Sequence, residues 1–355
     1  MLLSKDAKDR LTAWWEHQDM DRPCFAICRQ DMPADNLSSE DVASYWTDVD
    51  GILKRNMWKI DHTTSYCEGV KAHYIDFGST PLGACLGGEL NLVDRQTTWN
   101  VPFLTEVEEV INLTLQPDNK WWKLIRQVTE RSAAIAHGHH YVTYPSLAGM
   151  LDILSALIGL EPTLYALMDS PEEVLQAEDH LLKIWEQVFR ELGQIIDRSQ
   201  NDGYVGGWPG IWSPGRSYPI QEDMAYMMSV EMFEKFGLPY IDAMAQMMDD
   251  PYYHLDGKGA IKCVDSLCSL SKLKVVQWMP GAGNEELSQW HDLIKHILDL
   301  GKSVHVYARP HEVAPLIKAV GAKGVLVGVM FENDHEINHF LDEYQLTPED
   351  LPVIS

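Results

Sequence analysis

The stretch YYHLDGKGAIK, residues 252–262, places two ionisable side chains at the end of an apolar run. His254 and Asp256 follow two tyrosines and precede a segment with a helical pattern. A neutral imidazole and a carboxylate can act as general base and acid, or can bind a divalent cation through nitrogen and oxygen. We therefore predict that His254 and Asp256 are catalytic, and that the same pair can hold a metal ion such as zinc.

Other chemically capable side chains also stand at the ends of apolar runs. Asp76 and Arg29 are predicted to be catalytic as a carboxylate and a guanidinium facing the same space. A further set of aromatic and polar residues is expected to line a substrate pocket: Glu68, Tyr144, Trp208, Trp212, Trp278 and His305. The alternative for each is a structural role, since Asp256 could hold a turn and the tryptophans could simply pack. The histidines of AHGHH (136–140) precede a strand at the other end, and we interpret them as core or surface residues.

These residues need elements that bring them to one place. Short apolar runs predict eight strands, over 23–28, 72–76, 140–145, 203–208, 252–256, 275–279, 303–307 and 324–329. Because helical patterns separate these runs, parallel βα units are indicated, and a closed (β/α)8 barrel is the simplest way to join them. The carboxyl ends of the strands would then meet at one mouth. A doubly wound sheet is the alternative, but no strand is followed by GxGxxG or GxxxxGK[ST].

The helices between the strands have recognisable ends. Ser170, Pro171 and Glu173 mark one helix start with a cap, a first-turn proline and a capping-box carboxylate, and Asn284 is predicted to cap another. Helices are predicted over 36–60, 105–135, 170–198 and 284–301, with an inserted β-hairpin over 87–101. We expect a single domain over residues 1–355, with N-terminal helices and a barrel core of about 20–330.

The overall composition restricts the classes of function. A net charge of −25 without a basic stripe argues against nucleic acid and against anionic membrane surfaces. No run reaches the ~18 apolar residues of a spanning helix, and the amino terminus becomes charged too soon for a secretory signal. The six cysteines show no CxxC spacing and read as reduced thiols. We therefore expect a soluble cytoplasmic protein that acts on a small molecule.

Several stretches, taken in order, resemble the uroporphyrinogen decarboxylase superfamily, which includes zinc- and corrinoid-dependent methyltransferases. They are DRPCFAICRQ, YIDFGSTPLGACLGGEL, LAGMLDILSALIG, QEDMAYMMSVEMFEKFGLPYI, YYHLDGKGAIKCVDSL and VVQWMPGAG. Together they cover roughly residues 20–330, and the resemblance implies the same (β/α)8 barrel. No single stretch is specific, but their order is.

The two branches of this superfamily imply different sites. In the decarboxylases an Arg-Gln-Ala-Gly-Arg segment grips substrate carboxylates; Arg29 and Gln30 match it, but the next three residues depart from it. The essential aspartate of that branch corresponds to Asp76. The methyltransferases have His-x-Cys where this chain has His254-Leu255-Asp256, so a thiolate-rich zinc site is excluded and His254 with oxygen ligands remains.

Methyl transfer is the function that the resemblance favours. It implies a methyl group moved between a small methylated substrate and a partner corrinoid protein docked over the mouth, with zinc or a general acid assisting the leaving group. A cofactor-free decarboxylase of the uroporphyrinogen type, and a non-catalytic barrel that binds a small ligand, stay open as alternatives. A carboxylate-rich tetrapyrrole needs cations, and this mouth offers only Arg29, Arg216 and Lys258. A homodimer is one assembly that the resemblance allows.

Overall fold

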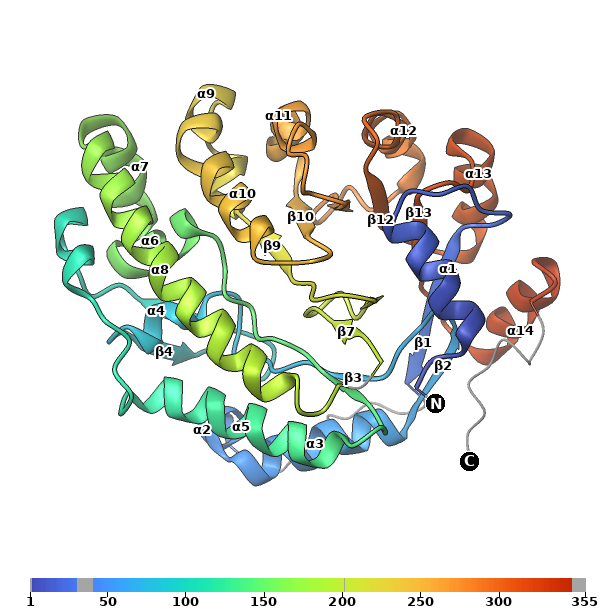
Figure 1. The fold of residues 1–355 in the computed structure, drawn as a ribbon, viewed down its shortest axis with the longest axis horizontal. Helices are drawn as coiled ribbons and strands as arrows, with labels where there is room; N and C mark the ends of the chain where they lie inside the picture. The colour runs from blue at the N-terminus through green and yellow to red at the C-terminus, as the bar shows by residue number, and fades with distance from the viewer. Residues whose placement is uncertain (1, 31–40, 201, 347–355) are drawn as a thin grey trace.

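The computed structural model describes residues 2–30, 41–200 and 202–346, and its centre is a seven-stranded sheet (Figure 1). The strand order is β2-β1-β13-β12-β11-β10-β9. Every neighbouring pair is parallel except β1 and β2, which are antiparallel. The strands are β1 (Cys24–Gln30), β2 (Thr63–Cys67), β9 (Pro219–Gln221), β10 (Tyr252–Asp256), β11 (Val275–Met279), β12 (Ser303–Ala308) and β13 (Val325–Val329). The chain is therefore a mixed α/β protein with a mostly parallel central sheet.

The remaining strands form three separate pairs. β3 (Ala72–His73) and β6 (Tyr141–Val142) are parallel, and β7 (Tyr204–Val205) and β8 (Trp212–Ser213) are antiparallel. β4 (Glu89–Leu92) and β5 (Thr98–Val101) form the predicted inserted hairpin. Hydrogen bonds within the described ranges do not close a ring of eight strands, because the unpredicted β2 occupies the free edge of β1. The predicted strands 72–76, 140–145 and 203–208 each keep only two paired residues.

Helices surround these strands (Figure 1). They are α1 (Lys5–Trp15), α2 (Val42–Thr47), α3 (Val49–Asp61), α4 (Pro81–Cys85), α5 (Lys120–Ala136), α6 (Met150–Ile158), α7 (Leu160–Asp169), α8 (Pro171–Ile196), α9 (Val230–Met232), α10 (Leu238–Gln246), α11 (Val264–Cys268), α12 (His291–Asp299), α13 (Pro310–Val320) and α14 (Asp334–Glu343). The helix predicted over 170–198 is confirmed by α8, with proline in its first turn. The cap predicted at Asn284 is wrong, because helical structure begins only at a short 3-10 helix, η6 (Leu287–Trp290).

Two other predicted helices are interrupted. The segment 105–135 contains a short 3-10 helix, η2 (Val107–Asn112), and then α5. In the segment 36–60, α2 and α3 are separated by Asp48, which caps α3 through its carboxylate. Residues 36–40 of that prediction lie outside the described residues. Capping side chains in both segments stop one helix and start the next, which hydrophobic periodicity alone does not show.

Helix α1 covers the amino-terminal ends of the strands. Its cap residue Ser4 accepts a hydrogen bond from the Ala7 amide. Trp14 and Trp15 are buried, and their indole N–H groups donate to the carbonyls of Gly324 (3.1 Å) and Trp212 (2.9 Å). Buried indoles need such partners, so these bonds fix α1 in place. The carboxyl ends of the strands are left as the open end.

Within the described ranges, no helix taken singly has both the length and the apolar character needed to cross a membrane. Helices α6 and α7 meet the composition test only as a pair, and they are bent by 115° at the break between them. Most of α6 is buried in the core, including Leu151, Leu154 and Leu157.

Candidate metal site and adjoining cavity

Three potential metal ligands meet at the carboxyl ends of β9 and β10. They are Asp223, His254 and Asp256, and one ligand atom of each lies within 4.8 Å of the other two. His254 and Asp256 are two residues apart on β10 and so project from the same side of the strand. Asp223 begins the short 3-10 helix η3 (Asp223–Tyr226), which follows β9. One nitrogen and two carboxylate oxygens form a donor set that zinc and other divalent cations accept.

The imidazole of His254 is oriented by its neighbours. Its Nδ1 lies 2.6 Å from Oε1 of Gln277, and its ring meets the Trp208 ring edge-on at 5.4 Å. With the amide placed this way, Nδ1 carries the proton and Nε2 keeps a lone pair that can bind a cation. Burial lowers the pKa of His254, so the ring is neutral near pH 7.

The carboxylates of the site repel one another. Burial raises the pKa of Asp223 well above its usual value, and the charges of Asp152 and Asp256 raise it further. Asp152, on α6, is fixed by accepting hydrogen bonds from the amides of Asp223 (3.0 Å) and Met224 (3.1 Å). Burial also raises the pKa of Asp152. A divalent cation would reverse this repulsion, so the charges and the donor set both fit a metal ion.

A cavity of about 950 Å³ adjoins the site. It contains three residues predicted from the sequence, Arg29, Trp208 and His305, together with Lys59 and Tyr307. Trp208 lines the cavity and also meets the His254 ring edge-on, so the cavity and the candidate metal site share this residue. The cavity is large enough for a small organic molecule with an aromatic or apolar body.

Asp76 lies near the same cavity. Burial by surrounding atoms raises the pKa of its carboxyl group, although solvent reaches part of the side chain. Its charge interacts with Lys59 and Tyr74, both of which line the cavity. Arg29, by contrast, forms an ion pair with Asp334. The catalytic residues predicted from the sequence therefore gather around one open end, with Asp223 added to them.

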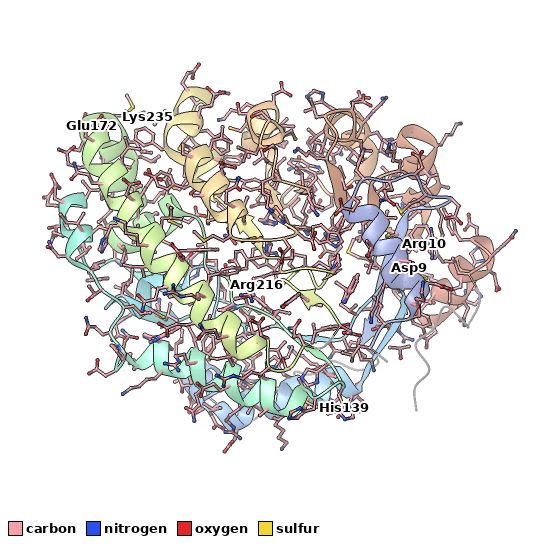
Figure 2. All side chains as sticks on the ribbon, viewed as in Figure 1. Asp9, Arg10, His139, Glu172, Arg216 and Lys235 are labelled. Carbon is pink, nitrogen blue, oxygen red and sulfur yellow. The ribbon has the colours of Figure 1, made fainter. Side chains whose placement is uncertain are left out.

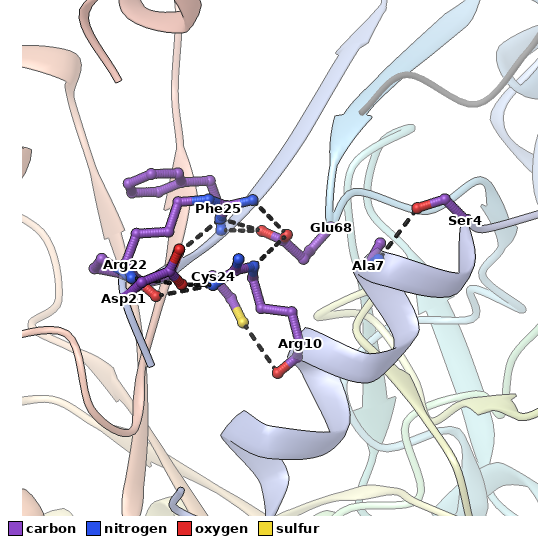
Figure 3. A network of polar contacts seen from close by, with 9 residues as sticks. Ser4, Ala7, Arg10, Asp21, Arg22, Cys24, Phe25 and Glu68 are labelled. Carbon is purple, nitrogen blue, oxygen red and sulfur yellow. Dashed lines mark hydrogen bonds and ion pairs between the residues drawn. The ribbon is translucent and has the colours of Figure 1, made fainter. Parts of the chain in front are cut away.

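Glu68 lies at the opposite end, beside the start of β1, and its predicted place at the mouth is wrong. Figure 3 shows its contacts with Arg10, Arg22 and Phe25. Its carboxylate accepts hydrogen bonds from the Arg22 guanidinium at 2.8 and 3.0 Å and from the Phe25 amide at 2.6 Å. The side chain is only 2% exposed. The cause is topological: β2 runs antiparallel to β1, so the residue after β2 lies beside the start of β1. Glu68 is a structural ion-pair residue.

Three aromatic residues predicted for the pocket also pack elsewhere. Trp212 donates from its indole N–H to the Asp202 carbonyl and contacts α1 at the closed end. Trp278 is buried against Trp290, with ring centroids 5.0 Å apart. It faces outward because Gln277, its neighbour on β11, faces the site and side chains alternate along a strand.

Tyr144 is the third residue of this group. It stacks on Phe189 of α8 with ring centroids 4.6 Å apart, and its hydroxyl lies 3.3 Å from Arg216. Arg216 is labelled in Figure 2. Arg216 is also paired with Asp197, which removes it from the cations available to a substrate. The pocket-lining roles predicted for Trp212, Trp278 and Tyr144 are therefore wrong, whereas Trp208 and His305 do line the cavity.

Asp223 was missed because β9 is too short to recognise. Its three residues, Pro219–Gln221, begin with a proline and contain no apolar run. Gln221 pairs with His254 on the neighbouring strand, and this pairing brings Asp223 to the site.

Comparison of the chain with models of known protein families, and with curated proteins, finds no match in either case. The case for a function of this chain therefore depends on its own residues and their geometry.

Proposed function

We propose that this chain is a metal-dependent methyltransferase related to the uroporphyrinogen decarboxylase superfamily. It would move a methyl group between a small methylated substrate and a corrinoid protein. The observation that carries the proposal is the convergence of Asp223, His254 and Asp256 within 4.8 Å, next to a cavity of about 950 Å³. A zinc ion held by these three residues would supply Lewis-acid polarisation of the heteroatom that bears the methyl group.

The residues of the chain would divide the remaining work. Trp208 and Tyr307 offer aromatic walls to the substrate, and burial raises the pKa of the Tyr307 hydroxyl to about 12, so it stays a neutral hydrogen-bond donor. Asp76 has a raised pKa near the cavity and could hold a proton for the leaving group. Substrate packed in the cavity would also exclude water from the reacting groups.

The decarboxylase alternative has less support. It needs Arg29 to grip a substrate carboxylate, but that guanidinium is already paired with Asp334. Of the other two cations named for this role, Arg216 is paired with Asp197, whereas Lys258 is exposed. The carboxylates around His254, on the other hand, favour a cation and disfavour an anionic substrate.

The proposal includes the finer architecture and the partner. We propose that β3 and β6 complete a (β/α)8 barrel with β1 and β9 to β13, which the parallel pairing of β3 with β6 supports. The corrinoid protein would dock over the open end, where Tyr226, Met227 and Met330 expose about half of their surface. A homodimer, and a cytoplasmic location, stay predictions.

The test is zinc content together with methyl transfer. The purified full chain is incubated with zinc, desalted and analysed for bound metal, and demethylation of a panel of methylated compounds is followed through the spectrum of an added corrinoid protein. We expect one zinc per chain in the parent and loss of zinc and activity in His254→Ala. His296→Ala is the matched control, because His296 also contacts a carboxylate, Asp265, but on the exposed surface. A parent that takes up no zinc, or a His254→Ala variant with the affinity of the parent, would contradict the proposal.

A further inference from the structure

Four polar side chains lie in register across β9 to β12. Gln221 is opposite His254, His254 is opposite Gln277, and Gln277 is opposite His305. Residues at equal height on parallel strands form a layer, and in a packed sheet interior such layers are usually apolar. Here Gln221 is 5% exposed, Gln277 is 1% exposed and His305 is fully buried. Buried polar groups need hydrogen-bond partners. His254, Gln277 and His305 are joined to one another by hydrogen bonds, whereas Gln221 bonds to Asp223.

The hydrogen bonds of this polar layer run in one direction. His254 Nδ1 lies 2.6 Å from Gln277 Oε1, and Gln277 Nε2 lies 3.1 Å from His305 Nδ1. The Tyr252 hydroxyl also contacts His305 Nδ1. An amide nitrogen can only donate and an amide oxygen can only accept. With Gln277 in this orientation, His254 therefore carries its proton on Nδ1 and His305 carries its proton on Nε2, which has no acceptor among the described residues.

One amide thus determines the tautomer of two histidines. A neutral imidazole has a single N–H, so the contacts of both rings with the Gln277 amide decide which nitrogen carries it. If the Gln277 amide turned over, its N–H would face His254 Nδ1, and the His254 proton would move to Nε2. That nitrogen would then have no lone pair for a cation near Asp223 and Asp256.

We propose that Gln277 is a positioning residue: it holds His254 in the tautomer whose Nε2 can bind a metal, and it is itself held by His305. Gln221 does the corresponding work for Asp223, since its Nε2 donates to the Asp223 carboxylate at 3.2 Å. Its Oε1 lies 3.2 Å from the hydroxyl of Ser146, which also contacts the Ser79 carbonyl. Two ligands of the candidate metal site are therefore oriented by two buried glutamines. Outer hydrogen bonds of this kind tune metal affinity by 10–100-fold in other metal sites.

The first experiment measures the tautomers without metal. The full chain is labelled with 15N-histidine, stripped of metal with a chelator, and the ring nitrogens are assigned by comparison with His254→Ala and His305→Gln. We expect His254 protonated on Nδ1 and His305 protonated on Nε2 in the parent. In Gln277→Met the His254 ring should lose that preference. In Gln277→Glu, whose carboxylate only accepts, His254 should keep its tautomer while His305 moves its proton to Nδ1.

The second experiment measures zinc affinity by competition with a chromophoric chelator. Gln277→Met should bind zinc 10–100-fold more weakly than the parent, and Gln277→Glu should restore most of the loss. A merely structural role for Gln277 would lower stability in both variants without this difference. The opposite tautomers in the parent, or an unchanged His254 tautomer in Gln277→Met, would overturn the inference. The inference rests on the proposed function only for the identity of the ligand: if the parent binds no zinc, the proposed function fails while the metal-free tautomers still decide the role of Gln277.

Discussion

His140 allows a quantitative test of the structure at acid pH. It lies in the AHGHH segment, is 1% exposed, and neither of its ring nitrogens has a hydrogen-bond partner among the described residues. Burial lowers its pKa from 6.5 to about 4, with a further contribution from His139, while the charge of Asp61 opposes the shift. His73 is buried beside it, and its own pKa is lowered to about 3 by burial and by His140. Protonation of His140 is therefore easier in the unfolded chain than in the folded one.

The sign and size of the effect follow from linkage. Between pH 6.5 and 4 the unfolded chain binds a proton at His140 that the folded chain does not, so the free energy of unfolding falls as the pH falls. A shift from 6.5 to about 4 corresponds to a loss of ~2.5 kcal/mol at pH 4.5 relative to pH 7.5. In His140→Leu, a substitution of similar volume, this contribution should disappear.

Urea denaturation at pH 7.5 and 4.5 measures the difference. The parent should lose ~2.5 kcal/mol more than His140→Leu between the two pH values, because the other titrating groups are common to both proteins. His335→Leu, a replacement of an exposed histidine, should behave like the parent. If the parent and His140→Leu lose the same stability, the ring of His140 is not buried and unpaired as described.

Two further substitutions test buried acids. Glu178, on α8, has both carboxylate oxygens buried without a hydrogen-bond partner in the described part of the chain, and burial raises its pKa well above 4.5, with Asp179 adding to the shift. Since the folded chain then keeps a proton that the unfolded chain releases, the free energy of unfolding should fall by up to ~1.4 kcal/mol per pH unit above 4.5. Glu178→Gln should reduce this pH dependence in denaturation curves between pH 5 and 7. An unchanged pH dependence would refute the conclusion that Glu178 is buried and protonated. Glu68→Gln should lower stability by ~3–5 kcal/mol, because it leaves Arg22 without its buried partner, yet should leave zinc affinity unchanged in the folded fraction. A selective loss of zinc affinity would instead support the original prediction that Glu68 lies at the mouth.

The elements that could be predicted from the sequence are those whose signal is local. β10 and β11 begin and end at the predicted residues, because each is a short and mainly buried run of five residues. β12 and β13 agree to within one residue for the same reason. α8 was recognisable from the proline in its first turn and from an apolar stripe that packs on the core, although its predicted cap residue Ser170 makes no side-chain capping hydrogen bond. Burial patterns and helix starts depend on residues that are adjacent in the chain, so a single sequence is enough to predict them.

What could not be predicted depends on pairing between distant segments. β2 was not predicted, and its antiparallel pairing with β1 is what carries Glu68 to the closed end. β9 has three residues and a proline, so only its pairing with β10 reveals it, and Asp223 was missed with it. The residues around Glu68 and Asp223 do not indicate which strand lies next to them.

The direction in which side chains point on β10 and β11 could have been predicted more fully from the sequence. Once His254 is taken to face the site, the parallel register of β10 and β11 makes Gln277 face it too, and side-chain alternation turns Trp278 away. A glutamine inside the otherwise apolar run VVQWM is itself a signal, because a buried amide is costly unless it is hydrogen-bonded. Natural sequences break the apolar rule mainly where function requires it. The same reasoning applies to His305 in SVHVYA, so the two exceptions on β11 and β12 point to one polar layer, and that layer leads to His254.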